Sequence, residues 1–210
     1  MTAPAEVPPE DLSPAPHGAA CLRSDTGEVL SLRVDRWADQ ATAAERELLN
    51  SAPAPVLDVG CGPGRAVVAL AESGTPAMGV DAARSPVRMA RERGAPVLER
   101  SIFDPLPATG RWGSAILLDG NIGIGGDPNA LLRRLAELLR PGGLVLAEVQ
   151  PPGSPLRRLR VRIEREGQCT PWFLWSLVSA ADLSVLGTPW FQPARSTFFD
   201  ERWFARLTRV

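Results

Sequence analysis

The sequence has no lysine and no tyrosine, and its single histidine, His17, lies in a stretch rich in proline and alanine. Enzymes that form a Schiff base on lysine, or that use tyrosine as a proton donor or acceptor, are therefore excluded. If His17 is set aside with that stretch, carboxylates such as Asp119 and Glu148 are the available general bases.

Cysteines are also few, and none of the three stands in a C-x-x-C pair. They predict neither a zinc site nor a disulfide framework, so no metal is expected. No apolar run reaches the length of a membrane span, and the N-terminus lacks the basic-then-apolar pattern of a secretion signal. The composition thus predicts a cytoplasmic protein that does not act at a membrane.

The strong basic excess of a general nucleic-acid binder is missing as well, because the formal net charge is −1. No nucleic-acid partner is therefore expected. The length fits one domain with a sizeable core. We predict a flexible tail over residues 1–20, which are rich in proline and alanine. Residues 21–210 are predicted to form a single domain, with residues 150–178 as an inserted segment.

One stretch, Val56–Arg65, carries most of the information about function, and it reads VLDVGCGPGR. Its apolar start and the helical pattern after it predict a buried strand, a tight turn and a helix N-terminus. Gly60, Gly62 and Gly64 permit positive φ angles and the close approach of a ligand. The helix start offers unpaired N–H groups with a partial positive charge, and Asp58 adds an anion. The turn can therefore hold a ligand with charges of both signs, such as an amino-acid zwitterion.

The spacing of these glycines separates two families of nucleotide-binding turn. The dinucleotide fingerprint G-x-G-x-x-G needs a third glycine at position 65, where this chain has Arg65. The observed D-x-G-x-G-x-G, with a second acidic residue, Asp81, after another apolar run, closely resembles motif I of the class I S-adenosylmethionine (SAM) dependent methyltransferases. The resemblance extends from about Arg33 to the end of the chain.

This resemblance implies a Rossmann-like, doubly wound α/β fold. Its sheet would be mostly parallel and seven-stranded, with an antiparallel C-terminal hairpin. The residue pattern of the inserted segment adds a small inserted hairpin to this fold. The hydrophobic pattern agrees, since apolar runs alternate with helical periods. Strands are predicted at residues 56–58, 77–81, 96–98, 112–118, 144–149, 187–191 and 202–210. Helices are predicted at residues 33–50, 65–73, 85–94, 128–139 and 179–186.

The resemblance also implies SAM as the cofactor and S-adenosylhomocysteine (SAH) as the product. The family places Asp81 at the ribose, and a carboxylate can accept both vicinal hydroxyl hydrogens. The implied cofactor-binding residues are Asp58, Gly60, Cys61, Gly62, Gly64, Asp81, Ala82, Ser101, Ile102, Asp119 and Gly120.

Position 101 departs from the family pattern. The family usually has an acidic residue there, against the adenine amino group, whereas this chain has Ser101. Ser101 can still accept one hydrogen bond from the amine, and the backbone of Ile102 can meet the ring. Asp104 could make the adenine contact instead, or it could cap the proline-rich turn that follows. Whether Ser101 or Asp104 contacts the adenine is left open.

Asp119, Gly120 and Asn121 follow the fourth predicted strand, whose carboxyl end faces the crevice beside motif I. Asp119 is the candidate catalytic base. Asn121 is a candidate substrate-binding residue, placed to orient a polar group of the substrate or the methionine part of SAM. The alternative is a structural turn in which both side chains bond to nearby backbone.

Within the inserted segment, the strict alternation of Leu159–Arg165 predicts a half-exposed strand of a hairpin. Trp172, Phe173 and Trp175 follow it, and they form either an apolar wall for a substrate or a packing surface against the sheet. Trp172 and Trp175 are the candidate substrate-binding residues of this segment. Trp37, on the predicted helix 33–50, either covers the SAM pocket or anchors that helix.

Together these features predict a SAM-dependent methyltransferase that acts on a small metabolite or natural product. The N/D-P-P-Y/F motif, frequent in enzymes that methylate amide-like nitrogens, is absent after the fourth strand. A non-catalytic SAM-binding partner protein is a second hypothesis. An NAD(P)-dependent oxidoreductase is a third, disfavoured by Arg65 and by the missing tyrosine and lysine. The methyl acceptor, the atom methylated and the oligomeric state are left open.

Overall fold

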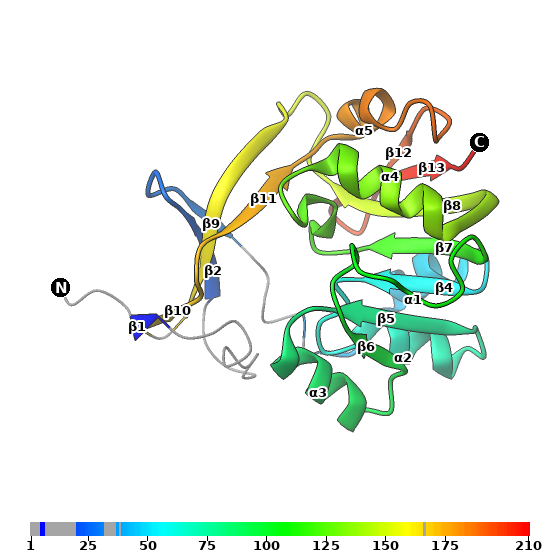
Figure 1. Ribbon diagram of the computed structural model, residues 1–210, viewed down its shortest axis with the longest axis horizontal. Coiled ribbons are helices and arrows are strands. Elements are labelled where there is room, and N and C mark those ends of the chain that lie inside the picture. The colour runs from blue at the N-terminus through cyan, green and yellow to red at the C-terminus, as the bar shows by residue number, and fades with distance from the viewer. Residues whose placement is uncertain (1–4, 7–19, 32–36, 38, 166) are drawn as a thin grey trace.

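The computed structural model describes residues 5–6, 20–31, 37, 39–165 and 167–210, and these residues form two β-sheets with helices around the larger one (Figure 1). The predicted tail, residues 1–20, falls largely outside the described residues, and so does His17. The described part of the tail consists of strand β1 (Ala5–Glu6) and the first residue of β2 (Ala20–Ser24).

The larger sheet has seven strands in the order β12-β13-β8-β7-β4-β5-β6, as the family resemblance predicted. Strands β4 to β8 are parallel to one another, whereas β13 runs antiparallel to both β8 and β12. The strands are β4 (Val56–Val59), β5 (Ala77–Asp81), β6 (Val97–Glu99), β7 (Trp112–Leu117), β8 (Leu139–Val149), β12 (Arg195–Phe199) and β13 (Arg202–Thr208). The chain builds outward from β4 to β6 and then crosses back to β7. Ligands bind at such a reversal, outside the carboxyl ends of the strands.

Helices cover both faces of this sheet, and the burial of strand β7 shows this most clearly. Successive side chains of a strand point to opposite faces, and every residue of β7 is buried. Ala115 and Leu117 pack in the apolar cluster with α4 and α5, whereas Ile116 packs in the cluster with α1 and α2. The helices are α1 (Ala43–Asn50), α2 (Arg65–Glu72), α3 (Arg84–Glu92), α4 (Pro128–Leu138) and α5 (Ala180–Leu186).

The helix before motif I is shorter than predicted. It begins at Ala43 rather than Arg33, because Thr42 caps it: the Thr42 hydroxyl accepts a hydrogen bond from Glu45 N, and the Glu45 carboxylate accepts one from Thr42 N. Such a capping box marks a helix start more sharply than hydrophobic periodicity does. Trp37 therefore precedes α1, and residues 32–36 and 38 lie outside the described residues.

Two boundaries in the second half of the chain also differ from the prediction. Residues 187–190 form a turn and 191 a single bridge, so the first strand of the C-terminal hairpin is β12 instead. The side chains of β12 are mostly exposed, and the strand lacks the apolar alternation that would reveal it in the sequence. Strand β8 begins at Leu139, directly after α4, rather than at Leu144.

The second sheet, called the cap sheet below, contains β1, β2, β3 (Val29–Ser31), β9 (Arg157–Arg165), β10 (Gln168–Cys169) and β11 (Phe173–Leu177). The predicted hairpin within residues 150–178 is confirmed, because β9 pairs antiparallel with β11. Strand β9 also pairs antiparallel with β2, which brings the N-terminal β2–β3 hairpin into the same sheet. Figure 1 shows the cap sheet standing at the end of the larger sheet to which the arrows of β4, β5 and β7 point.

Candidate active site

The turn between β4 and α2 depends on its glycines. Gly60, Gly62 and Gly64 have φ angles of +71°, +52° and +84°, a region that other residues rarely adopt. The turn is held to the neighbouring strand, since Gly60 N donates a hydrogen bond of 2.8 Å to Val80 O. At Gly62 an added Cβ would have no atom within 4 Å, so this part of the backbone is accessible. At Gly64 a Cβ would lie 3.0 Å from that of Ala90, so Gly64 serves the packing of α2 against α3.

Asp81, at the end of β5, is bonded to the same turn. Its Oδ2 accepts a hydrogen bond of 2.9 Å from Gly62 N, and its Oδ1 accepts one of 2.8 Å from Ala83 N. Burial raises the pKa of this carboxyl, and the two backbone N–H groups oppose the shift. Each carboxylate oxygen retains a further lone pair for a ligand.

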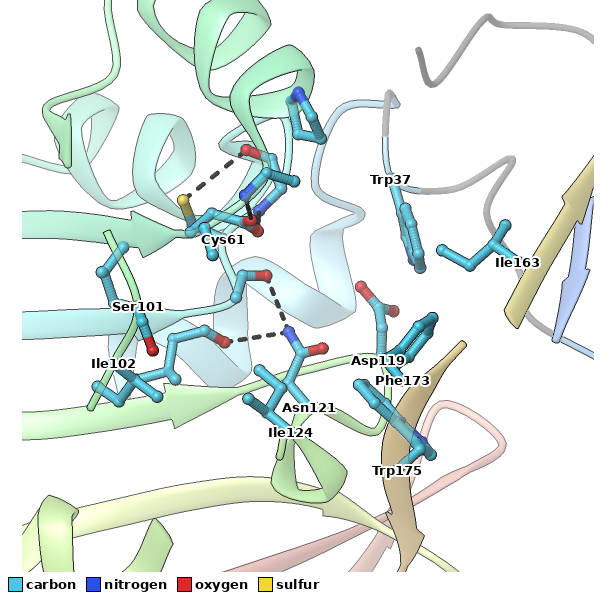
Figure 2. Close-up of a pocket in the computed structure, with 18 of the residues that line it drawn as sticks. Trp37, Cys61, Ser101, Ile102, Asp119, Asn121, Ile124, Ile163, Phe173 and Trp175 are labelled. Atoms are coloured by element: carbon cyan, nitrogen blue, oxygen red, sulfur yellow. Dashed lines mark hydrogen bonds between the residues drawn. The ribbon is translucent and has the colours of Figure 1, made fainter. Parts of the chain in front are cut away.

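Asn121 ties a different loop to the turn. It opens the short helix η2 (Asn121–Gly123), and its Nδ2 donates hydrogen bonds of 3.0 Å to Val59 O and 2.8 Å to Gly60 O (Figure 2). A Cβ at Gly60 would lie only 2.6 Å from this Nδ2. Glycine at position 60 therefore makes room for the Asn121 amide as well as for the turn.

A closed ring of charged side chains lies under the carboxyl end of β7. Arg65 Nη2 is 2.9 Å from Asp119 Oδ2 and 3.3 Å from Glu45 Oε1. Arg202 continues the ring, 3.1 Å from Glu45 Oε1 and 3.4 Å from Glu148 Oε2. Asp119 N closes it with a hydrogen bond of 2.8 Å to Glu148 Oε2. Four of the five side chains are at least four-fifths buried, whereas that of Asp119 is 22% exposed at the pocket.

The acidic groups here are shifted toward their neutral forms. Burial raises the pKa of Asp58, which is 3% exposed, to about 7, although the charge of Arg65 opposes the shift. Burial also raises the pKa of Asp119 and of Glu148, and Arg65 again opposes both shifts. A ligand with a positive charge would favour the ionised form of each of these carboxyls.

The motif I turn, Asp58, Asp81 and Asp119 line one pocket of about 610 Å³, within the range of roughly 300–1,000 Å³ common for ligand sites. One end, called the motif I end, lies against the turn, Asp81, Ser101 and Ile102. The other, called the cap end, lies against Trp37 and the cap sheet. In Figure 2, Trp37 and Ile163 enter this end from one side and Phe173 and Trp175 from the other, around Asp119.

Most of the predicted site residues line this pocket. They are Asp58, Gly60, Cys61, Gly62, Asp81, Ala82, Ser101, Ile102, Asp119, Asn121, Trp172 and Trp175. Gly64 and Gly120 are not among the lining residues. Gly120 has a φ of +78° and shapes the bend after β7. Asp104 does not line the pocket either. Its Oδ2 accepts a hydrogen bond of 3.2 Å from Ser101 N and so caps the turn.

The family model for a methyltransferase domain matches residues 33–186 of the sequence. The chain belongs to this family. The match confirms the resemblance that motif I and Asp81 predicted. No curated protein sequence matches the chain.

Solved structures with the same fold include several methyltransferases. A SAM-dependent methyltransferase from Bacteroides fragilis, in complex with SAH, has a TM-score of 0.75 at 23% identity, over 91% of this chain and 87% of that one. The 1,6-didemethyltoxoflavin-N1-methyltransferase of Burkholderia thailandensis has a TM-score of 0.60 at 21% identity, over 84% and 81% of the two chains. An amino pentose methyltransferase from Micromonospora echinaspora has a TM-score of 0.58 at 16% identity, over 79% and 88%.

Two further features of this methyltransferase domain concern metals and membranes. Within the described residues, no group of three histidine, cysteine, aspartate or glutamate side chains is placed to hold a metal ion. In the same part of the chain, no helix is long and apolar enough to cross a membrane.

Sequence reasoning missed the ring of charges. Arg65 stood out only as the place where a glycine was lacking, and Glu45 and Arg202 are far from it in the chain. Glu148 did leave a signal, because it interrupts the apolar run of β8. Arg134 was also missed: it lies on α4, and its Nε donates a hydrogen bond of 3.0 Å to Ile102 O, which braces the loop at the motif I end.

Proposed function

We propose that this chain transfers the methyl group of SAM to a nucleophile on a small molecule. The observation that carries the proposal is the convergence of the motif I turn, Asp81 and the aromatic side chains of the cap sheet on one pocket. Two structures with this fold were solved with SAH bound, which supports SAM as the cofactor. The family match adds support for methyl transfer as the reaction.

The residues present fit the chemical groups of SAM. The start of α2, whose N-cap is a glycine without a side-chain cap, offers N–H groups to a carboxylate, and the open space beside Gly62 lets a ligand approach the turn. Asp58 offers a carboxyl to an ammonium group, and Asp81 has lone pairs for ribose hydroxyls. We assign the adenine contact to Ser101 and Ile102, because the Asp104 carboxylate accepts a hydrogen bond from Ser101 N within the turn.

SAM supplies an electrophilic methyl group on a positively charged sulfur. In the proposed reaction, an acceptor oxygen or nitrogen forms a bond to the methyl carbon while the carbon–sulfur bond breaks, and its electron pair stays on sulfur. The chain orients the two reactants and excludes water through the cap sheet. Asp119, the ring carboxylate that reaches the pocket, would take the proton that leaves the acceptor.

The shape of the pocket favours catalysis over SAM binding alone. A non-catalytic partner protein needs space for SAM only, and its acceptor space would be blocked. Here the pocket continues past Asp119 to the cap end, lined by Trp37, Phe173 and Trp175.

The first experiment measures SAH binding by calorimetry in the natural protein, in Asp81→Ala and in Asp127→Ala. Both aspartates accept hydrogen bonds from two backbone N–H groups, but Asp127 caps α4 and does not line the pocket. Loss of a hydrogen bond to a charged group costs about 1.5–3 kcal/mol, so Asp81→Ala should weaken SAH binding by roughly 10- to 150-fold. Asp127→Ala should lower the melting temperature and leave SAH affinity unchanged.

Methyl transfer is then tested with labelled SAM and a library of small-molecule acceptors. Natural protein that does not bind SAH would contradict the proposed cofactor. Equal loss of SAH affinity in both variants would show that Asp81 acts through stability alone. Binding of SAH without transfer to any acceptor would favour the non-catalytic hypothesis.

A further inference from the structure

The cap end of the pocket has its own chemistry. Five of its lining side chains are apolar or aromatic, and they come from β2, β9, β11 and the segment before α1: Leu22, Trp37, Ile163, Phe173 and Trp175. Figure 2 shows four of them, Trp37, Ile163, Phe173 and Trp175, around the carboxylate of Asp119. This end is where an acceptor would meet the methyl group, if the proposed function holds.

Phe173 and Trp175 form a wall with a defined shape. They are two residues apart on β11, so their side chains share one face of the strand. Their ring centroids are 6.1 Å apart with an interplanar angle of 83°. The wall therefore presents the face of one ring next to the edge of another, an arrangement on which a flat ring system can stack. Trp172 differs, because the guanidinium groups of Arg160 and Arg162 lie 5.7 and 4.8 Å from the centre of its ring.

The wall is also fixed in place by the loop after β7. Trp175 forms an isolated backbone bridge with Ile124, and Ser176 Oγ donates a buried hydrogen bond of 2.9 Å to Gly126 O. At Gly123 an added Cβ would lie 2.2 Å from Ser176 O, so the two backbones are in close contact. A rigid wall of this kind binds a rigid ligand without a further ordering cost.

Polar groups are sparse at this end. Among the described lining residues, its polar side chains apart from the tryptophan indoles are Asp119, Thr170 and Arg165. Thr170 Oγ1 accepts a hydrogen bond of 2.9 Å from Ile163 N, and Asp119 is paired with Arg65. Arg165 has a partner of its own and is 7% exposed. A hydroxyl of an acceptor that finds no partner here would cost about 1–3 kcal/mol.

We propose that the methyl acceptor is a flat, uncharged aromatic molecule that carries its nucleophilic hydroxyl or amino group at one edge. This inference rests on the proposed function and narrows it. The ring system stacks on the face of one of the two rings, Phe173 or Trp175, and meets the edge of the other, and the nucleophilic group points toward Asp119. A polyhydroxylated sugar does not fit, because this end has too few hydrogen-bonding groups for its hydroxyls. The chain would differ in this respect from the amino pentose methyltransferase that shares its fold.

The test uses 2-naphthol as an aromatic probe and glucosamine as a sugar probe, each titrated into protein saturated with SAH. Calorimetry should show that 2-naphthol binds at least tenfold more tightly than glucosamine. Phe173→Ala should weaken 2-naphthol binding at least fivefold and SAH binding much less. Phe173→Leu, which keeps most of the apolar volume, should still lose part of the affinity because the ring is gone. The control is Phe198→Ala, which removes an exposed ring that packs on Trp203 in the far hairpin and should change neither affinity.

Glucosamine binding as tightly as 2-naphthol would overturn the proposal. So would unchanged 2-naphthol affinity in both Phe173 variants. An equal loss of SAH and 2-naphthol affinity would assign the wall to the cofactor and overturn the proposal as well. These results are distinct from failure of the proposed function, in which the natural protein does not bind SAH at all.

Discussion

Asn121 offers a sharp test of how the site is built. Its amide donates two hydrogen bonds to the motif I turn, to Val59 O and Gly60 O. The same residue opens η2, whose loop is in contact with β11 of the cap sheet. We therefore expect Asn121 to be a positioning residue that holds the turn in its binding conformation, rather than a residue that selects the substrate. Its Oδ1 is the one side-chain atom left to contact a ligand.

The size of the effect follows from the two hydrogen bonds. A neutral hydrogen bond contributes about 0.5–1.5 kcal/mol net, so Asn121→Ala removes about 1–3 kcal/mol that fixes the turn. Ligand binding must then supply the free energy that orders the turn. SAH affinity should fall by a factor between about 5 and about 150. Asn121→Asp should lose at least as much, since a carboxylate cannot donate and would face two carbonyl oxygens.

Asn129 provides the control for this experiment. Its Nδ2 donates one hydrogen bond of 3.1 Å to Leu186 O, which joins α4 to α5, and it does not line the pocket. Asn129→Ala should lower the melting temperature and leave SAH affinity unchanged. Calorimetry with SAH and thermal unfolding without ligand are measured on all variants. If Asn121→Ala binds SAH as tightly as the natural protein, the turn does not depend on this amide and the reasoning is wrong.

Four further predictions follow from the same geometry. Because burial raises the pKa of Asp58 to about 7, SAH affinity should rise with pH by up to about tenfold per unit below pH 7 as the carboxyl ionises, and Asp58→Asn should flatten this profile. For the same reason, the free energy of unfolding should fall as the pH rises from about 4 to about 7, because in this range the Asp58 carboxyl is protonated in the folded protein and ionised in the unfolded chain. Gly62→Ala and Gly27→Ala both place alanine at positive φ without a steric neighbour, so both should cost about 1–2 kcal/mol of stability, but only Gly62→Ala should weaken SAH binding. Arg65→Leu leaves the largely buried Asp119 without its ion-pair partner and Glu45 with Arg202 alone, which costs about 3–5 kcal/mol. The calorimetric melting temperature should therefore fall by roughly 6–20 °C, and a change below about 2 °C would contradict the role of the ring of charges.

The parts of the fold that could be predicted are those whose signals are local. The string from Val56 to Arg65 contains a buried strand, a glycine turn and a helix start, each with its own physical reason, and all three are found where predicted. The predicted helix start at residue 128 is confirmed for the same reason, because the carboxylate of Asp127, the N-cap of α4, accepts hydrogen bonds from Asn129 N and Ala130 N. Strand β12 was misplaced because an exposed edge strand carries little pattern.

The cap sheet was predicted only in part, because pairing between distant strands leaves no local pattern. The alternation of Leu159–Arg165 revealed β9, but nothing in that stretch says which strands lie beside it. Cys21 pairs with Glu164 and Leu22 with Ile163 across the sheet, over a separation that no short motif spans. Leu22 and Ile163 consequently come together at the cap end of the pocket, although the predicted substrate contacts were only Asn121, Trp172 and Trp175.

Arg65 shows how the same residue can exclude one function and build another. As the wrong residue for the third glycine of a dinucleotide fingerprint, it argued against NAD(P) binding, and sequence reasoning stopped there. In the fold it begins α2 and turns back under β7, where it pairs with Asp119 and Glu45. A glycine at this position would leave Asp119 without this cation, and burial would then favour its neutral form more strongly. The departure from the fingerprint therefore places beside Asp119 a cation that favours its ionised form, between the motif I end and the cap end of the pocket.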